Sequence, residues 1–179
     1  FQYFSAPICS KKDKSHERCC SKSLRELEQL TQKFKGKVAA VIIEPIPGAQ
    51  GVLIPSREYL PALVEHCRKN KIFVIFDEVM TGFGRTGKWF SYQHWEVNPD
   101  IVTLSKGING GIAPLGAVVL SKEIAKYFDE NKLLCGLTNS GHPASCSAGV
   151  EAIRIYKKEH LIEKSAQMGI LLGKLVKET

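Results

Sequence analysis

Four short apolar runs alternate along the chain with segments whose apolar residues recur at helical spacing. Continuous runs of this kind are typical of strands that are buried on both faces of a parallel sheet. The runs are VAAVIIEP at 38–45, IFVIFDEV at 72–79, IVTLSKG at 101–107 and LGAVVLS at 115–121. We therefore expect four buried strands.

Helical periodicity fills much of the sequence between these strands. Leu24, Leu27 and Leu30 recur at every third position, as in an amphipathic helix. We expect helices over residues 22–34, 57–70, 143–158 and about 161–178. Strands that alternate with helices indicate an α/β fold with helices on both faces of the sheet.

Composition and charge limit the function classes. The 179 residues suggest one domain, and no apolar run approaches the ~20 residues of a membrane-spanning helix, so we expect no membrane partner. Much of the net charge of +7 lies between Lys11 and Lys37. Such a cluster can bind phosphates, but no nucleic-acid recognition motif or stacking aromatic accompanies it. We expect no nucleic-acid partner.

The six cysteines form no C-x-x-C pair. We therefore expect reduced thiols in an intracellular protein, either cytoplasmic or mitochondrial. The alternative is a metal site made by Cys9, His16, Cys19 and Cys20, although their spacing fits no known zinc pattern. We expect no metal.

Two neighbouring strands end in opposite charges, Asp77 and Lys106. Ligands of open α/β sheets bind at the carboxyl ends of the strands, and a charge there is costly unless it is paired or used. A salt bridge between the two is one interpretation. A reactive lysine is favoured because Gly107, Gly110 and Gly111 leave room around it.

A known chemistry uses such a pair. A desolvated lysine attacks an aldehyde to form a Schiff base, and pyridoxal phosphate supplies that aldehyde. The pyridine ring acts as an electron sink while a carboxylate keeps its nitrogen protonated. We therefore expect Lys106 at one edge of a pyridoxal phosphate ring and Asp77 at the other.

Four linked motifs carry a family resemblance. They are EPIPGAQGV at 44–52, IFDEVMTGFGRTGKWF at 75–90, PDIVTLSKGINGGIAPLGAVVLS at 99–121 and GLTNSGHPASCSAGVEAI at 136–153. Together they resemble class-III pyridoxal-phosphate aminotransferases, and most of all the ω-amino-acid or amine:pyruvate branch. The resemblance implies the three-layer αβα large domain of fold-type-I pyridoxal-phosphate enzymes and transamination from an amino donor to a keto acid such as pyruvate.

The resemblance also implies roles for single residues. Lys106 resembles the Schiff-base lysine, and Asp77 the partner of the pyridine nitrogen. Val79 resembles a residue that packs on one ring face. Thr138 resembles the threonine that reaches the cofactor phosphate of the neighbouring subunit, which implies a homodimer. Glu44 stands where the family has a glutamate near the entrance, although such a carboxylate can also cap a backbone group.

The resemblance divides the chain into three parts. Residues 1–37 are a basic segment plus a helix, 38–160 the central part of the cofactor-binding large domain, and 161–179 a helix leading toward a small C-terminal domain. The family's phosphate loop and its substrate-binding arginine are not among these residues. We expect the chain to be a piece of a longer protein and to be inactive, or nearly so, alone.

Other interpretations stay open. Ala49 replaces a glutamate of ornithine-type relatives, which argues against that branch. Isomerases, lyases and decarboxylases share the lysine motif, and a truncated product that binds a partner without catalysis is a further alternative. GFGRTG at 82–87 fits the dinucleotide fingerprint, but no helical periodicity follows it. Arg85 within it also fits a loop arginine anchored to carboxylates.

Overall fold

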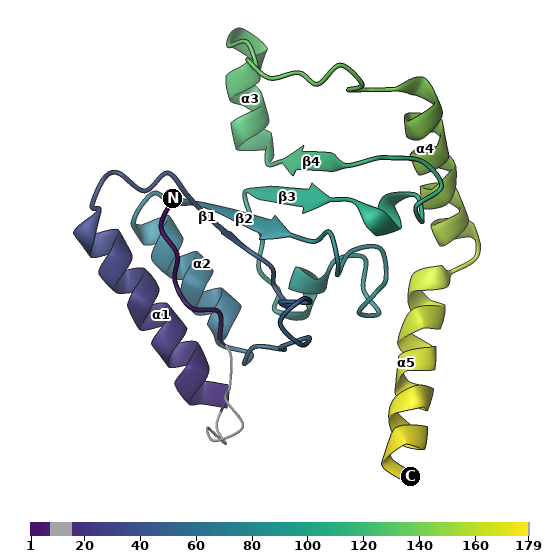
Figure 1. The fold of residues 1–179 in the computed structure, drawn as a ribbon, viewed down its shortest axis with the longest axis horizontal. Coiled ribbons are helices and arrows are strands. Elements are labelled where there is room, and N and C mark those ends of the chain that lie inside the picture. Colours follow the sequence, from purple (N-terminus) through teal and green to yellow (C-terminus); the bar gives the residue numbers. More distant parts are fainter. Residues whose placement is uncertain (8–15, 179) are drawn as a thin grey trace. The chain divides into compact units, whose positions relative to one another are not determined.

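The computed structural model describes residues 1–7 and 16–178, and the side chains of the first helix from residue 19 onward. The helices are α1 (His16–Lys33), α2 (Tyr59–Lys69), α3 (Lys122–Glu130), α4 (Pro143–Lys158) and α5 (Leu161–Glu178). The strands are β1 (Ala40–Ile43), β2 (Phe73–Asp77), β3 (Ile101–Leu104) and β4 (Ala117–Leu120) (Figure 1). Two 3-10 helices, η1 (Ser91–His94) and η2 (Lys106–Ile108), complete the elements.

The chain forms two compact units. The first contains Phe1–Asp77 and Tyr92–Ile101, and the second Glu78–Ser91 and Val102–Thr179. Within the described residues, no helix is long and apolar enough to cross a membrane.

The predicted strands and helices are confirmed, with two differences. Helix α1 begins at His16 rather than at residue 22. Helix α3 was not predicted, because it is short and none of its residues is buried. A serine cap starts α3, since Ser121 Oγ accepts a hydrogen bond from the backbone N–H of Ile124 at 3.3 Å.

Helices α1 and α2 form the core of the first unit with the parallel strands β1 and β2. The strands pair in register, with Val41 opposite Val74. The buried cluster consists of Cys20, Leu27, Val41, Tyr59, Leu60, Leu63, Val64, Cys67, Ile72, Val74 and Phe76. This single apolar layer is the main source of stability in the unit.

The prediction that the strands are buried on both faces is wrong for this chain. Alternate side chains of β1 and β2 point away from the core, and Ile42 is 58% and Phe73 47% exposed. In the second unit, Val118 and Val119 of β4 are 63% and 50% exposed. The apolar side chains on these exposed faces could pack against a second layer of helices. The described residues do not supply such a layer to β1 and β2.

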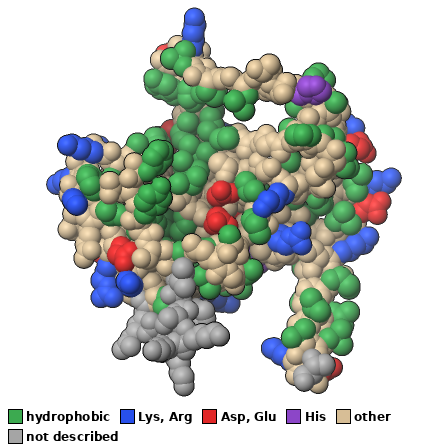
Figure 2. Space-filling view, in the orientation of Figure 1, with side chains coloured by type: hydrophobic (Ala, Val, Ile, Leu, Met, Phe, Trp, Pro, Cys, Tyr) green, Lys and Arg blue, Asp and Glu red, His purple; other side chains and the backbone are tan. Residues whose placement is uncertain are grey.

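The second unit contains β3, β4, α3, α4 and α5. Helix α4 lies against η2. At Gly149 it also approaches the segment before β4 closely, because a Cβ there would lie 2.6 Å from Cδ2 of Leu115. Helix α5 carries hydrophobic side chains along its exposed surface (Figure 2).

Candidate active site

Lys106 begins a sharp turn directly after β3. Its side chain is exposed and its backbone is left-handed, with a φ of +41°. This conformation is uncommon for any residue except glycine and persists only where surrounding contacts enforce it. One such contact joins the turn to the segment before β4, because Ser105 Oγ donates to the carbonyl of Leu115 at 3.0 Å.

Asn109 closes the rest of the turn. It is 2% exposed, and its side-chain N–H donates to the carbonyl of Ala113 at 2.7 Å. Its side-chain oxygen accepts from the N–H of Gly111 at 3.1 Å. The backbone around the lysine is therefore fixed by side chains, while the lysine amine itself stays accessible.

The glycines beside Lys106 have two different roles. Gly110 and Gly111 have left-handed φ values of +65° and +83°, and a Cβ on either would meet no described atom within 4 Å. The open space at these two glycines agrees with the prediction that they leave room around Lys106. The prediction is wrong for Gly107, where a Cβ would lie 2.8 Å from the Cβ of Phe83. Gly107 is needed because the turn packs closely on the loop at 78–91.

That loop is built from turns. Phe83 has a φ of +57°, and its N–H donates to the carbonyl of Trp89 at 2.7 Å. Gly82 approaches Glu78, since a Cβ there would lie 2.9 Å from the Glu78 carbonyl oxygen. Turns and bends occupy residues 79–90, and no helix opens within GFGRTG. The loop thus lacks the helix N-terminus that a dinucleotide site uses to bind phosphate.

A buried carboxylate organises the loop. Glu78 is 0% exposed and accepts hydrogen bonds from Thr81 Oγ1 at 2.6 Å, Ser91 Oγ at 2.7 Å and Ser91 N–H at 3.0 Å. Its own N–H donates to the carbonyl of Thr103 in β3 at 3.0 Å. This role of Glu78 was not predicted from the sequence. Its only local signal is the threonine three residues after Glu78, and Ser91 is too distant to be paired from sequence.

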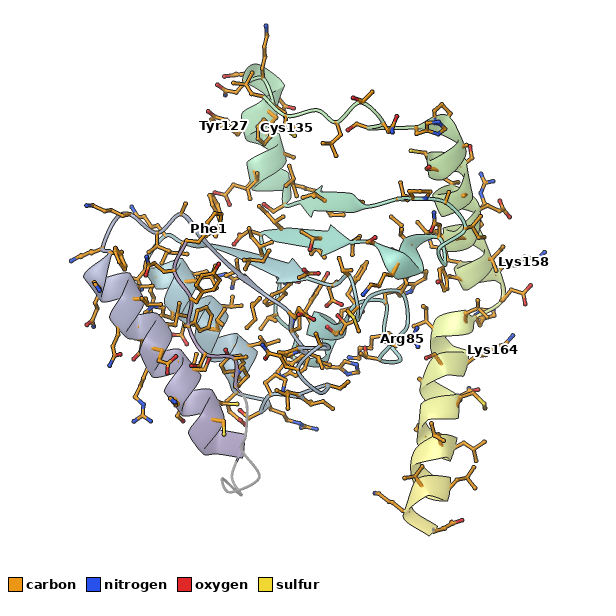
Figure 3. All side chains as sticks on the ribbon, in the orientation of Figure 1. Phe1, Arg85, Tyr127, Cys135, Lys158 and Lys164 are labelled. Atoms are coloured by element: carbon orange, nitrogen blue, oxygen red, sulfur yellow. The ribbon has the colours of Figure 1, made fainter. Side chains whose placement is uncertain are left out.

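Helix α5 supports the same loop from its N-terminal turns. Ser165 Oγ donates to the carbonyl of Gly84 at 2.7 Å, and a Cβ on Gly84 would lie 2.7 Å from Cδ1 of Ile162. Arg85 is exposed on the loop next to the start of α5 (Figure 3). The alternative that carboxylates anchor Arg85 is not supported, because it forms no ion pair with any described carboxylate.

Tyr156 of α4 contacts the loop and the lysine turn together. Its hydroxyl donates to the carbonyl of Gly107 at 2.8 Å. Its ring stacks on Phe83 with a centroid separation of 5.9 Å and meets the edge of Trp89 at 6.1 Å. The lysine turn, the loop and α4 therefore share one aromatic cluster.

The other predicted site residues lie as follows. Asp77 ends β2 in the first unit and is half-buried, and Val79 is half-buried in the loop of the second unit. Thr138 is exposed in the segment between α3 and α4. Glu44 caps a backbone group, because its Oε2 accepts from the N–H of Gly48 at 3.1 Å. That Asp77 and Lys106 face one ring remains a prediction.

The alternative metal site gains no support from the described cysteines. Cys19 and Cys20 are buried, and Cys20 Sγ accepts a hydrogen bond from the N–H of Ser56 at 3.4 Å. Cys9 and the side chain of His16 lie outside the described part of the chain. Among the described residues, no group of three or more potential metal ligands is found.

The chain was compared with known proteins. A family model described as Aminotransferase class-III matches residues 1–178. Putrescine aminotransferase of Pectobacterium atrosepticum is 39% identical over 150 residues, which are 84% of this chain and 32% of that protein. Acetylornithine aminotransferase of Methanocaldococcus jannaschii is 40% identical over 146 residues, which are 78% of this chain and 35% of that protein.

A solved structure extends the similarity to the fold. Taurine:2-oxoglutarate aminotransferase from Bifidobacterium kashiwanohense, in complex with PLP and glutamate, has a TM-score of 0.85 and 40% identity and covers 90% of this chain and 36% of its own. The expected α/β fold is thereby confirmed. The chain spans about a third of the length of the curated relatives it matches. The family match over nearly every residue shows that the chain belongs to the class-III aminotransferases.

Proposed function

We propose that this chain supplies the lysine-bearing part of a pyridoxal-phosphate aminotransferase. The full-length protein that carries it would transfer an amino group from an ω-amino acid or amine to a keto acid such as pyruvate. The observation that carries the proposal is the position of Lys106. An exposed amine on a left-handed turn, directly after β3, stands where the family resemblance puts the cofactor lysine.

The side chains of Lys106, Asp77 and Val79 have the chemistry that pyridoxal phosphate requires. Class-III aminotransferases use pyridoxal phosphate, whose aldehyde condenses with an amine and whose protonated ring withdraws electrons. Lys106 offers a primary amine beside the open space at Gly110 and Gly111. Asp77 offers a half-buried carboxylate that would keep the ring nitrogen protonated, and Val79 would pack on one ring face.

Thr138 supports a homodimer with shared sites. Its segment from residue 131 to 142 is exposed throughout, so its hydroxyl is accessible to a second subunit. We propose that Thr138 donates to the cofactor phosphate held by the neighbouring subunit, as the family resemblance implies. Each site would then need both subunits.

The names of the relatives support a proposal for the class of the amino donor. Putrescine and taurine, which name two of them, each carry a primary amine on a terminal carbon. Ala49 also replaces the glutamate of ornithine-type relatives, although an acetylornithine aminotransferase matches equally well. We therefore propose a terminal amine as the donor and a keto acid such as pyruvate as the acceptor.

Covalent trapping tests the proposal. The full-length protein is mixed with pyridoxal phosphate, reduced with borohydride, digested and analysed by mass spectrometry. We expect one modified lysine, Lys106, and no modification in Lys106→Arg, which keeps the charge. Modification of another lysine, or of none, would overturn the proposal.

Keto-acid consumption separates transamination from the other reactions of this scaffold. We expect the full-length protein to consume one keto acid per amine, whereas an isomerase, lyase or decarboxylase would consume none. We expect no turnover by the 179-residue chain alone, because it spans only about a third of its relatives. Turnover by that chain would exclude a non-catalytic role for it.

A further inference from the structure

The carbonyl of Gly107 is held from outside its own segment. Ser105 and Asn109 bond to partners within residues 105–115, whereas Tyr156 is 49 residues from Gly107 in the sequence. The Tyr156 hydroxyl donates at 2.8 Å to the peptide carbonyl one residue after the lysine. This hydrogen bond therefore ties the lysine turn to α4.

The Tyr156 ring is itself fixed. Phe83 stacks on it with an interplanar angle of 28°, and Trp89 meets it edge-on at 71°. Phe83 also meets Gly107 at the distance where no Cβ fits. The hydroxyl is thus directed at the turn by packing on two sides, which is how a supporting side chain fixes a reactive group.

We propose that Tyr156 is a positioning residue that sets the direction of the Lys106 amine through the Gly107 carbonyl. The inference rests on the proposed role of Lys106. A left-handed lysine is disfavoured by its own backbone and must be enforced by its neighbours. Without the hydrogen bond, the turn would populate other conformations, and a smaller fraction of molecules would present the amine correctly.

The experiment measures the attachment of pyridoxal phosphate to Lys106 in the full-length protein. Attachment is trapped with borohydride at a series of times and cofactor concentrations. This gives a maximal rate and a half-saturating concentration. Tyr156→Phe keeps the stacked ring and removes only the hydroxyl. We expect the maximal rate to fall about fivefold, which corresponds to the loss of one hydrogen bond, with the half-saturating concentration unchanged.

Tyr127→Phe is the matched control. Tyr127 is 61% exposed on α3, and removal of its hydroxyl is expected to change neither value. A merely structural role for Tyr156 would reduce the fraction of protein that reacts, or leave both values unchanged. Either result would overturn the inference.

A second variant covers the case in which Tyr156→Phe does not fold. Phe83→Leu keeps the Tyr156 hydroxyl but removes the stacked ring, and we expect the maximal rate to fall about twofold. An unchanged maximal rate in this variant would also overturn the inference. If Lys106 of the unaltered protein is not labelled, the proposed function itself fails. If it is labelled and the variants match it, only the role of Tyr156 fails.

Discussion

The core of the first unit and the lysine turn of the second unit are held by different forces. Leu60, Leu63 and Phe76 of the core are each 0% exposed and pack in one apolar layer. The lysine turn instead combines glycines, left-handed residues and side-chain hydrogen bonds around the exposed Lys106. We therefore expect stability and cofactor attachment to depend on separate residues, so that mutations change them separately.

The largest expected effect is on the core. Leu63→Ala in the full-length protein should lower the free energy of unfolding by roughly 2–5 kcal/mol, because it opens a cavity in a fully packed site. The folded variant should still attach pyridoxal phosphate to Lys106 at the normal rate. Glu65→Ala, on the exposed side of the same helix, should change little, since it removes only a surface pair with Lys69. Equal denaturation curves for the two variants would contradict the claim that the buried apolar layer stabilises the first unit.

Gly107→Ala should instead impair the attachment of pyridoxal phosphate to Lys106. Its new Cβ would clash with Phe83, so either the lysine turn or the loop must move, at a cost of roughly 1–3 kcal/mol. We expect loss of Lys106 labelling in protein that remains folded. Gly169→Ala is the control, because its Cβ meets no described atom and lies within α5. That control should label normally and be slightly more stable, by up to ~1 kcal/mol. Normal labelling of Gly107→Ala would show that the close packing is not needed.

Glu78→Gln tests whether the buried carboxylate stabilises the loop. Glutamine keeps one side-chain oxygen that can accept, but it places an NH2 group where the other oxygen accepts in Glu78. At least one of the Thr81 and Ser91 donors therefore loses its acceptor. We expect a loss of roughly 1–3 kcal/mol in chemical denaturation. The exposed Glu58→Gln is the matched control and should unfold like the unaltered protein. Identical denaturation curves for both variants would show that the Glu78 carboxylate does not stabilise the loop.

The pH dependence of the core is an effect that is absent near neutral pH, because it begins only at the ordinary pKa values of a buried thiol and a buried phenol. Burial raises the pKa of the Cys67 thiol from 9.0 to about 12 and that of Tyr59 from 10.0 to about 12. Both groups are neutral at lower pH, and the unfolded chain loses these protons first as the pH rises. The free energy of unfolding should therefore fall between the ordinary pKa values and pH 12.

Cys67→Ala should remove the part of this decline that begins near pH 9 and leave the part due to Tyr59. Denaturation at several pH values measures both parts. A slope that is the same with and without the thiol would contradict the assignment of the pKa shift to burial.

Periodicity alone predicted most of the fold. The apolar runs located all four described strands, and helical spacing located four of the five described helices. Helix α3 lacks the buried face that periodicity detects, so it was missed. The exposure of Ile42 and Phe73 could not be predicted either. An apolar run indicates that a side chain can be buried, but it does not indicate whether another element covers it.

The site could be predicted only where it is local in sequence. Lys106 and its glycines follow a strand closely in the sequence, so the lysine motif could be recognised from the sequence alone. The contacts of Glu78 with Ser91 and of Tyr156 with Gly107 span 13 and 49 residues, and tertiary packing alone brings them together. Gly107 was misread for the same reason, because its close neighbour Phe83 belongs to another loop.

We propose that Asp77 and Lys106 lie at opposite edges of one pyridoxal phosphate ring. A crystal structure of the full-length protein with pyridoxal phosphate tests it most directly. We expect continuous density from Lys106 Nζ to the cofactor and an Asp77 carboxylate oxygen about 2.7–2.9 Å from the pyridine nitrogen. A ring bound to another lysine, or an Asp77 carboxylate out of reach of that nitrogen, would contradict it.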